Sequence, residues 1–203
     1  MNQVSTGRQV FLGFDPGKYP EGIHMCFIFS DDEERKHVLA KFMESGFGED
    51  DQVAYFVDTM SPAELREHFS AMGVHLPDDD SCLLLSAEET YCPDGAFAVE
   101  RMLSTLENAY LRCCESGHSG LRVTGEMNWA LRGMPGSERL IEYESRVNDV
   151  LKKFPVTAIC QYDARLFDGA TLYRLLTVHP MMIVNGRVVR NPYYIHPEQE
   201  ARS

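Results

Sequence analysis

Short apolar runs alternate with segments of helical periodicity along most of this chain. Runs rich in branched and aromatic residues are typical of buried strands. The expected strands cover residues 23–29, 53–57, 82–85, 121–124 and 156–162. The expected helices cover residues 31–46, 62–73, 94–116, 137–154 and 171–176. This alternation predicts an α/β protein with three layers, in which a mostly parallel sheet carries helices on both faces.

Local signals mark two helix starts and one hairpin. The acidic residues 31–34 follow the first apolar run and oppose the positive end of a helix dipole. Ser61 and Pro62, with Glu64 after them, come close to a capping box. Asn185-Gly186 stands between the apolar pairs of a C-terminal segment and predicts a β-hairpin at one edge of the sheet.

Length and composition favour one domain. The chain has 203 residues, which suits a single α/β unit. Residues 1–21 are rich in glycine, proline and charge, so we expect a flexible leader there. The domain is then expected to run from residue 22 to residue 196, and residues 197–203 to form a tail.

Bulk charge and cysteine usage exclude several classes of function. The net charge of -12 repels polyanions, so we expect no direct DNA binding. No apolar stretch approaches the ~20 residues that span a bilayer, and the first residues lack the apolar core of a signal peptide. The six cysteines form no Cys-x-x-Cys pair and suit reduced thiols. These features predict a cytoplasmic protein without a membrane segment.

The one glycine-lysine pair does not make a phosphate-binding loop. Gly17-Lys18 lacks the earlier glycine of a Walker A motif, because Leu12 stands there, and Tyr19 and Pro20 follow it. The loop after the first expected strand, residues 30–34, carries four carboxylates that repel a triphosphate. We therefore expect no ATP at this position.

Two histidines and two cysteines form a candidate metal set. His24 and Cys26 lie two residues apart in an expected strand and so point to one face. Cys160 lies on another expected strand, and His179 stands before the hairpin. Zinc or another transition metal accepts such ligands. Cysteine and histidine are also common as packed core residues, so a metal, a non-metal ligand and plain packing all remain open.

Polar residues that follow the expected strands form the candidate ligand site, because ligands of open parallel sheets bind outside the carboxyl ends of the strands. Glu126 can reach a metal or water, or it can cap the next helix; Trp129 can wall a pocket or fill the core. The set also includes His24, Cys26 and Cys160 of the candidate metal set. The candidates are His24, Cys26, Ser30, Glu34, Arg122, Glu126, Trp129, Cys160, Tyr162 and Asp163.

Arg122 is unusual among these candidates because it lies within an expected buried strand. A buried charge needs a partner. Glu144, Asp163 and Glu126 are the carboxylates that we consider as that partner, and the sequence does not choose among them.

Several spaced segments between residues 22 and 194 carry a resemblance to a known family. They are residues 22–26 with Glu33-Glu34 after them, residues 121–127, Tyr143-Glu144, residues 160–163, and His179-Pro180 with the hairpin. In this order they resemble the MEDS domain, the sensory module of DcmR-type regulators of methanogens, methylotrophs and other bacteria. The resemblance implies one MEDS-like sensory domain over residues 22–196, with a RecA-like or KaiC-like core that lacks a working Walker A loop.

The resemblance also implies a function. Such domains look like sensors of small molecules, such as simple hydrocarbon derivatives, that feed transcription regulators or histidine kinases. His24, Cys26 and Cys160 are the ligand contacts it suggests most strongly. DcmR-type regulators carry a DNA-binding or kinase domain that this sequence lacks, so we expect the signal to pass through a partner protein.

We therefore expect a non-enzymatic small-ligand sensor of prokaryotic signal transduction. One alternative is an atypical KaiC-like ATPase that binds a nucleotide through backbone N–H groups, with Glu126 as the base. The other is a pure interaction protein whose histidines and cysteines only pack. The identity of the ligand and the occurrence of a homo-oligomer stay open.

Overall fold

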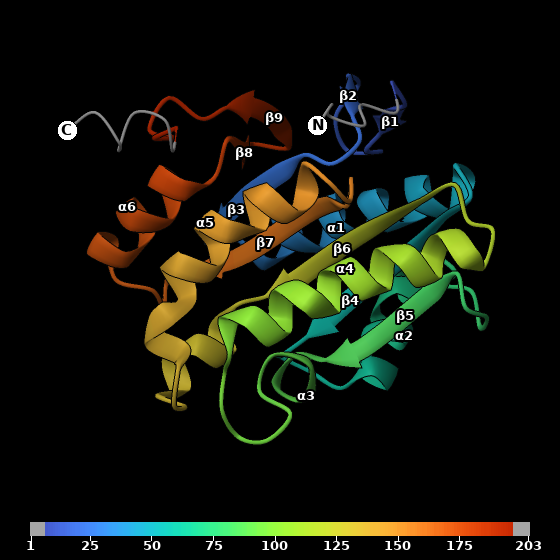
Figure 1. Ribbon diagram of the computed structural model, residues 1–203. Coiled ribbons are helices and arrows are strands. Elements are labelled where there is room, and N and C mark those ends of the chain that lie inside the picture. Colours follow the sequence, from blue (N-terminus) through green and yellow to red (C-terminus); the bar gives the residue numbers. More distant parts are fainter. Residues whose placement is uncertain (1–6, 197–203) are drawn as a thin grey trace.

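A seven-stranded sheet forms the middle layer of the computed structural model, which describes residues 7–196 (Figure 1). The strand order is β5-β4-β6-β7-β3-β8-β9, and all neighbours are parallel except β8 and β9. The strands are β3 (His24–Phe29), β4 (Asp51–Val57), β5 (Cys82–Ser86), β6 (Gly120–Glu126), β7 (Thr157–Asp163), β8 (Met181–Val184) and β9 (Arg187–Arg190). The expected mostly parallel sheet with a C-terminal hairpin at one edge is confirmed.

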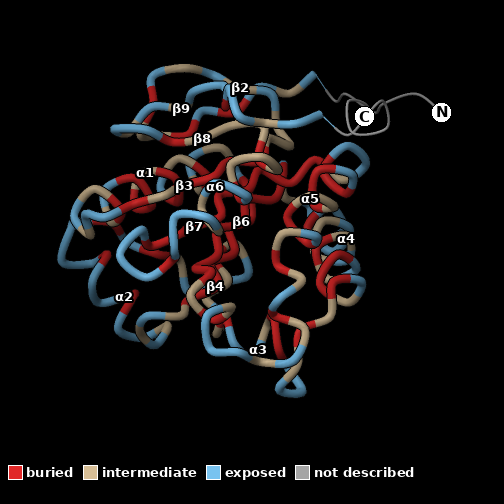
Figure 2. The backbone as a smooth tube through the Cα atoms, turned by 90° about the vertical axis from the view of Figure 1, so that its left-hand side faces the viewer, coloured by how far each residue is buried: buried red, intermediate tan, exposed pale blue. Residues whose placement is uncertain are grey.

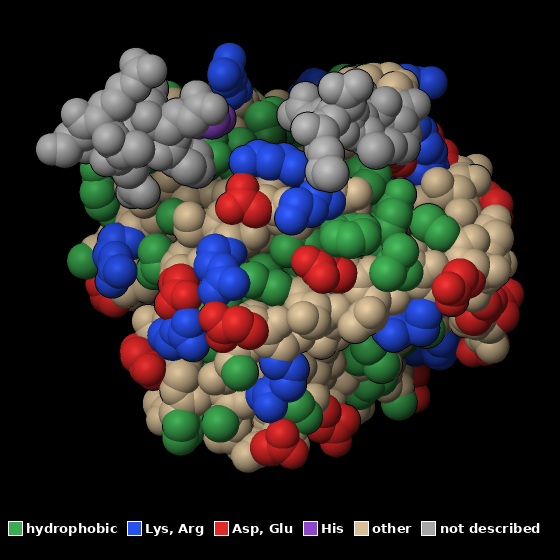
Figure 3. Space-filling model, viewed as in Figure 1, with side chains coloured by type: hydrophobic (Ala, Val, Ile, Leu, Met, Phe, Trp, Pro, Cys, Tyr) green, Lys and Arg blue, Asp and Glu red, His purple; other side chains and the backbone are tan. Residues whose placement is uncertain are grey.

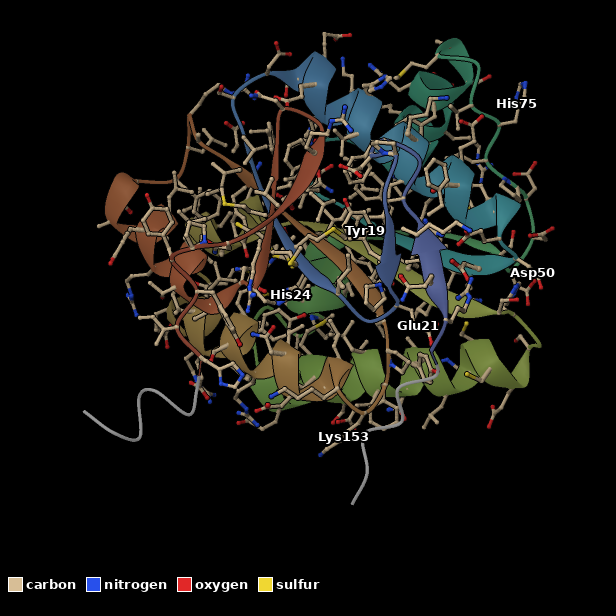
Figure 4. The ribbon with its side chains drawn as sticks, turned by 90° about the horizontal axis from the view of Figure 1, so that it is seen from above. Tyr19, Glu21, His24, Asp50, His75 and Lys153 are labelled. Carbon is tan, nitrogen blue, oxygen red and sulfur yellow. The ribbon has the colours of Figure 1, made fainter. Side chains whose placement is uncertain are left out.

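Helices cover both faces of this sheet, as Figure 4 shows from above. One face carries α1 (Asp32–Gly48) and α2 (Pro62–Ala71). The other face carries α4 (Val99–Glu115), α5 (Leu140–Leu151) and α6 (Gly169–Val178). The short α3 (Ala87–Tyr91) follows β5, and two 3₁₀ turns, η1 (Asn128–Arg132) and η2 (Ser137–Arg139), precede α5. The three-layer α/β architecture predicted from the sequence is thus confirmed.

The sheet separates two apolar cores. Because successive residues of a strand point to opposite faces, Met25 and Phe27 of β3 pack toward α1, whereas Cys26 packs toward α5 and α6. Figure 2 shows that the central strands are buried along their length, while β2 and β9 are exposed at one end of the molecule. Among residues 7–196, no helix is both long and apolar enough to cross a bilayer.

The predicted helix starts have the expected chemistry. Asp31 caps α1, and its carboxylate accepts hydrogen bonds from the backbone N–H groups of Glu33 and Glu34. Ser61 and Glu64 form a reciprocal capping box at α2. Helix α1 continues past Gly46, which was expected to end it. A Cβ at Gly46 would lie 2.7 Å from Val53 and 2.9 Å from Arg122, so this glycine permits close helix–sheet packing.

The expected helix over residues 94–116 begins only at Val99. Pro93 and Gly95 account for the difference. Pro93 lacks the N–H that a helix interior requires, and Gly95 has a φ of +73°, outside the helical region, so the chain turns between α3 and α4. The expected helix over residues 137–154 likewise begins as a 3₁₀ turn and ends at Leu151.

The expectation of a flexible leader is wrong for residues 7–21. They form an antiparallel pair, β1 (Gln9–Phe11) and β2 (Lys18–Pro20), that covers one end of the molecule. Val10 and Leu12 are buried, and the Asp15 carboxylate accepts a hydrogen bond from the Val188 N–H of β9. Residues 1–6 and the expected tail lie outside the described residues, and the division into a domain from residue 22 stays a prediction.

Candidate functional site

Four side chains meet in the interior, between the sheet and the helices α5 and α6. His24 begins β3, Glu144 lies on α5, Cys160 lies in β7, and His179 caps the end of α6. All four are buried, and one potential metal-ligating atom from each lies within 4.8 Å of the others. Figure 4 labels His24, which lies between the sheet and the layer of α4 and α5. We refer to these four residues as the buried cluster.

One carboxylate oxygen of Glu144 is the centre of the buried cluster. Oε2 lies 3.2 Å from His24 Nε2, 3.4 Å from His179 Nε2 and 3.5 Å from Cys160 Sγ. The other oxygen, Oε1, accepts a hydrogen bond of 2.7 Å from the Tyr162 hydroxyl. The thiol of Cys160 lies 3.3 Å from His24 Nε2. Two nitrogens, a sulfur and an oxygen thus converge in the protein interior.

The histidine rings are oriented by groups outside the buried cluster. His24 Nδ1 lies 3.2 Å from Asn148 Oδ1, while the Asn148 amide donates to the backbone carbonyl of Val178. His179 Nδ1 lies 2.7 Å from the carbonyl oxygen of Leu175. Because both partners are acceptors, Nδ1 carries the proton in each ring, and Nε2 faces the buried cluster.

Burial determines the charge states of the buried cluster. Burial and the nearby His179 lower the pKa of His24, so its ring is neutral at neutral pH. Burial, together with the carboxylate of Glu144, raises the pKa of the Cys160 thiol well above its ordinary value. Without a cation beside it, Cys160 therefore stays protonated.

The structure brings together three of the four residues in the predicted metal set. Cys26 is the exception, because it lies outside the buried cluster, although its backbone is in register with Cys160. Glu144 takes its place. The sequence signal for Glu144 was its position on the apolar stripe of α5, where Leu140, Tyr143 and Val147 are also buried.

A hollow of about 840 Å³ lies beside the buried cluster, at the amino end of β3. The sequence predicted a site at the carboxyl ends of the strands, so the location differs. Its polar lining is His24, Asn148, Lys152, Arg190, Asn191 and His196. Its apolar lining is Ile23, Leu151, Pro180, Met181, Pro192 and Tyr194. Two residues connect this hollow, here called the His24 hollow, with the buried cluster: His24 belongs to both, and Asn148 contacts the ring of His24.

A smaller hollow of about 250 Å³ lies at the carboxyl end of β3. Three predicted ligand residues, Cys26, Ser30 and Glu34, line it together with residues of α6 and β8. These three residues are therefore close together, but in a place separate from the buried cluster.

Glu126 lies on the opposite face of the sheet, and its carboxylate is occupied. Oε1 accepts from the Tyr55 hydroxyl at 2.9 Å and lies 3.3 Å from Arg35. Oε2 accepts from the backbone N–H groups of Asp58 and Thr59. Glu126, at the end of β6, is therefore hydrogen-bonded to the residues that follow β4.

The remaining strand-end candidates are dispersed. Trp129 is buried in the α4–α5 core and stacks on Tyr91 with ring centroids 4.7 Å apart, and it lines neither hollow. Tyr162 contacts the buried cluster through Glu144. Asp163 lies on the face of α1, where it pairs with Arg165 at 2.6 Å. The predicted ligand set is thus divided among several places.

Arg122 pairs with none of the three carboxylates that the sequence offered. Its Nε donates to Asp51 at 2.6 Å, and one terminal nitrogen donates to Glu49 at 2.9 Å. The other terminal nitrogen donates to Ser45 Oγ and to the Phe11 carbonyl oxygen. Both acidic partners lie at the start of β4 or just before it, a segment to which the sequence analysis gave no role. Arg122 therefore lies near the amino end of β6, and its guanidinium is hydrogen-bonded within the protein.

Comparisons with known proteins agree with the fold and the sequence pattern. The family described as MEthanogen/methylotroph, DcmR Sensory domain (MEDS) matches residues 23–180. The transcriptional repressor DcmR of Methylorubrum extorquens is 37% identical over 79 residues, which are 38% of this chain and 30% of that protein. The matched part of this chain thus spans less than a third of that relative.

Solved structures show the same fold at low identity. A KaiC-like protein of Pyrococcus horikoshii has a TM-score of 0.61 and 17% identity, over 87% of this chain and 80% of that one. The flagellar accessory protein FlaH of Methanocaldococcus jannaschii has a TM-score of 0.57 and 13% identity, over 88% and 79%. The KaiC-like α/β core expected from the resemblance is therefore confirmed as a fold.

Proposed function

Because this chain belongs to the MEDS family of sensory domains, we propose that it senses a small organic ligand without transforming it and signals through a partner protein. A regulatory role agrees with the match to a transcriptional repressor.

The observation that carries the proposal is the His24 hollow. Ligand pockets of small molecules are mostly apolar hollows of roughly 300–1,000 Å³ with a few polar groups. The volume of about 840 Å³ fits this range. Ile23, Leu151 and Met181 offer apolar contact, while Arg190 can bind one polar or anionic group. A short-chain organic molecule with one such group is the ligand class that fits.

The walls of the His24 hollow connect it to an exposed surface. The segment 191–196 supplies one wall of the hollow. It is attached to the rest of the chain at Asn191, which donates to the carbonyls of Leu176, His179 and Pro180, and at Ile195, whose N–H donates to the Thr177 carbonyl. Tyr193 in this segment is 55% exposed, and its ring lies near that of Tyr173, which is 58% exposed. A ligand that orders this segment would change the surface offered to a partner.

Charge on the broad α4–α5 face does not favour nucleic acid as the partner. Blue and red side chains are interspersed across this view in Figure 3. Arg139 and Arg146 pair there with Glu100 and Glu142. A face with both signs of charge lacks the basic stripe that a nucleic acid requires, so we propose a protein partner.

The test is a thermal-shift and calorimetry screen of the purified chain with short-chain alcohols, halides, amines and carboxylates, and separately with ATP and Mg²⁺. Met181→Trp fills the His24 hollow, whereas Met72→Trp places the same ring on an exposed turn after α2. A compound that binds the wild type should bind Met181→Trp at least about tenfold more weakly, about 1.4 kcal/mol, and Met72→Trp equally well. Binding of ATP alone, or equal binding to both variants, would overturn the proposal.

A further inference from the structure

Three potential metal-ligating atoms surround one carboxylate oxygen in the buried cluster. The Nδ1 of each imidazole faces a protein acceptor, so each Nε2 is directed toward Oε2 of Glu144. His179 Nε2 is buried without a hydrogen-bond partner among the described residues, although it lies 3.4 Å from that oxygen. Among the described residues, no Lys or Arg pairs with Glu144. Such a constellation is costly in a protein interior unless a cation is bound.

We propose that His24 Nε2, Glu144 Oε2, Cys160 Sγ and His179 Nε2 bind one zinc ion in tetrahedral geometry. Zinc binds imidazole nitrogen, thiolate sulfur and carboxylate oxygen at about 2.0–2.3 Å, which gives tetrahedral edges of roughly 3.3–3.6 Å. One face of the tetrahedron, between His24 Nε2, Glu144 Oε2 and Cys160 Sγ, has edges of 3.2, 3.3 and 3.5 Å. His179 Nε2 lies 3.4 Å from Glu144 Oε2, and the ligand atoms of all four residues lie within 4.8 Å of one another. Three atoms therefore already lie close to the corners of such a tetrahedron, and His179 supplies the fourth ligand.

The surroundings of the buried cluster favour the same assignment. Metal-ligating histidines usually donate their second N–H to a carbonyl or carboxylate, and ligating carboxylates are hydrogen-bonded in turn. Asn148 and the Leu175 carbonyl fill the first role, and the Tyr162 hydroxyl fills the second. Because Tyr162 occupies Oε1, only Oε2 of Glu144 is free for the metal.

Four protein ligands leave no open coordination position. Closed, buried sites of this kind are structural, whereas catalytic zinc keeps one position for water or substrate. Binding removes the proton of the Cys160 thiol and releases it to water, so that zinc holds a thiolate. The site joins β3, β7, α5 and the end of α6. The metal thus holds together the elements that form the His24 hollow.

The experiment uses the full chain, freed of metal by a chelator and titrated with Co²⁺ in place of zinc. We expect one equivalent to bind, with the visible bands of tetrahedral cobalt and a thiolate charge-transfer band in the near ultraviolet. Zn²⁺ should then displace the cobalt. A titration without these bands would overturn the proposal.

Two matched serine variants separate the proposed ligand from its neighbour. Cys160→Ser should abolish the charge-transfer band and weaken metal binding more than about 100-fold, beyond the 10–100-fold expected for groups around a site. Cys26→Ser changes a buried thiol in register with Cys160 and should leave one bound equivalent and the band intact. The reverse pattern would contradict the assignment.

Glu144→Gln tests the oxygen ligand, and circular dichroism checks that each variant is folded. We expect weaker Co²⁺ binding with the charge-transfer band preserved at saturation. If the variants do not fold, X-ray absorption spectroscopy of the zinc-loaded wild-type protein identifies the atoms that coordinate the zinc. The proposal predicts one sulfur and three nitrogen or oxygen neighbours; a shell without sulfur would overturn it.

Discussion

Two buried polar clusters lie on opposite faces of the same sheet, and they are balanced differently. On the α1 face, the Arg122 guanidinium is paired with Asp51 and Glu49 and also donates to Ser45 and the Phe11 carbonyl. On the α5 face, the buried cluster combines Glu144 with two imidazoles and a thiol, and among the described residues no Lys or Arg pairs with Glu144. The first cluster is complete by itself, whereas the second is suited to a cation from solution.

This difference shows how burial separates a structural group from a binding group. A buried charge that the chain neutralises has no capacity left for a ligand, and loss of one of its partners is destabilising. A buried cluster whose atoms are fixed but not neutralised can take up an ion without rearrangement.

Removal of the charge on the α1 face should have the largest effect. Arg122→Met removes one of the two guanidinium groups that pair with the buried Asp51, the other being that of Arg8, and it also breaks the pair with Glu49. We expect a loss of about 3–5 kcal/mol in the free energy of unfolding. Arg146→Met, which breaks exposed pairs with Glu100 and Glu142, should cost less than about 1 kcal/mol. Urea denaturation measures both, and equal losses would remove the contrast between buried and exposed pairs.

Metal removal should act on the α5 face alone. Zinc at about 1,000 times its dissociation constant stabilises the folded state by about 4 kcal/mol. For a chain of this size, chelation should lower Tm by roughly 8–16 °C. The Tm of Cys160→Ser should not change when chelator is added, whereas the Tm of Arg122→Met should fall by a similar amount to that of the wild type. If neither chelator nor added zinc changed the Tm of the wild-type protein, that result would count against the proposed site.

The hydrogen bond to the other oxygen of Glu144 should have a smaller effect. Tyr162→Phe removes the donor to Oε1, and we expect zinc affinity to fall by about 10–100-fold. Tyr143→Phe is the matched control, because Tyr143 is also buried on the α5 side but contacts Tyr91 instead. Competition with a chromophoric chelator measures the affinities. Equal zinc affinity in the two variants would show that Tyr162 does not orient Glu144.

Coupling between the metal and the His24 hollow should be the smallest effect. His24 lines the hollow and also belongs to the buried cluster. Zinc should therefore raise the affinity of a ligand found in the screen by about fivefold or more, and the ligand should raise zinc affinity by the same factor. Calorimetry with and without zinc tests this. Identical ligand affinities would mean that the two places act independently.

The sequence predicted the parallel core well because burial and periodicity act locally. The runs that became β3 to β7 are apolar over most of their length, and Asp31 and Ser61 mark helix starts by short-range capping. The paired strands β1 and β2 escaped prediction because each has only three residues and lies among glycines and prolines.

The composition of the buried cluster depends on contacts between distant segments, so the sequence predicted it only in part. Alternation along β3 correctly placed His24 and Cys26 on one face. It could not show that the α5 carboxylate of Glu144 would lie nearer to His24 than Cys26 does, because that depends on how α5 packs on the sheet. The partners of Arg122 were missed for the same reason, since Asp51 lies on a neighbouring strand.

Anomalous diffraction at the zinc absorption edge, from crystals grown with zinc, tests the central claim most directly. The account predicts a single strong peak at bonding distance from His24, Glu144, Cys160 and His179, with Cys26 outside the coordination sphere. Zinc bound through Cys26 in place of Glu144, or no peak between the two histidines, would contradict it.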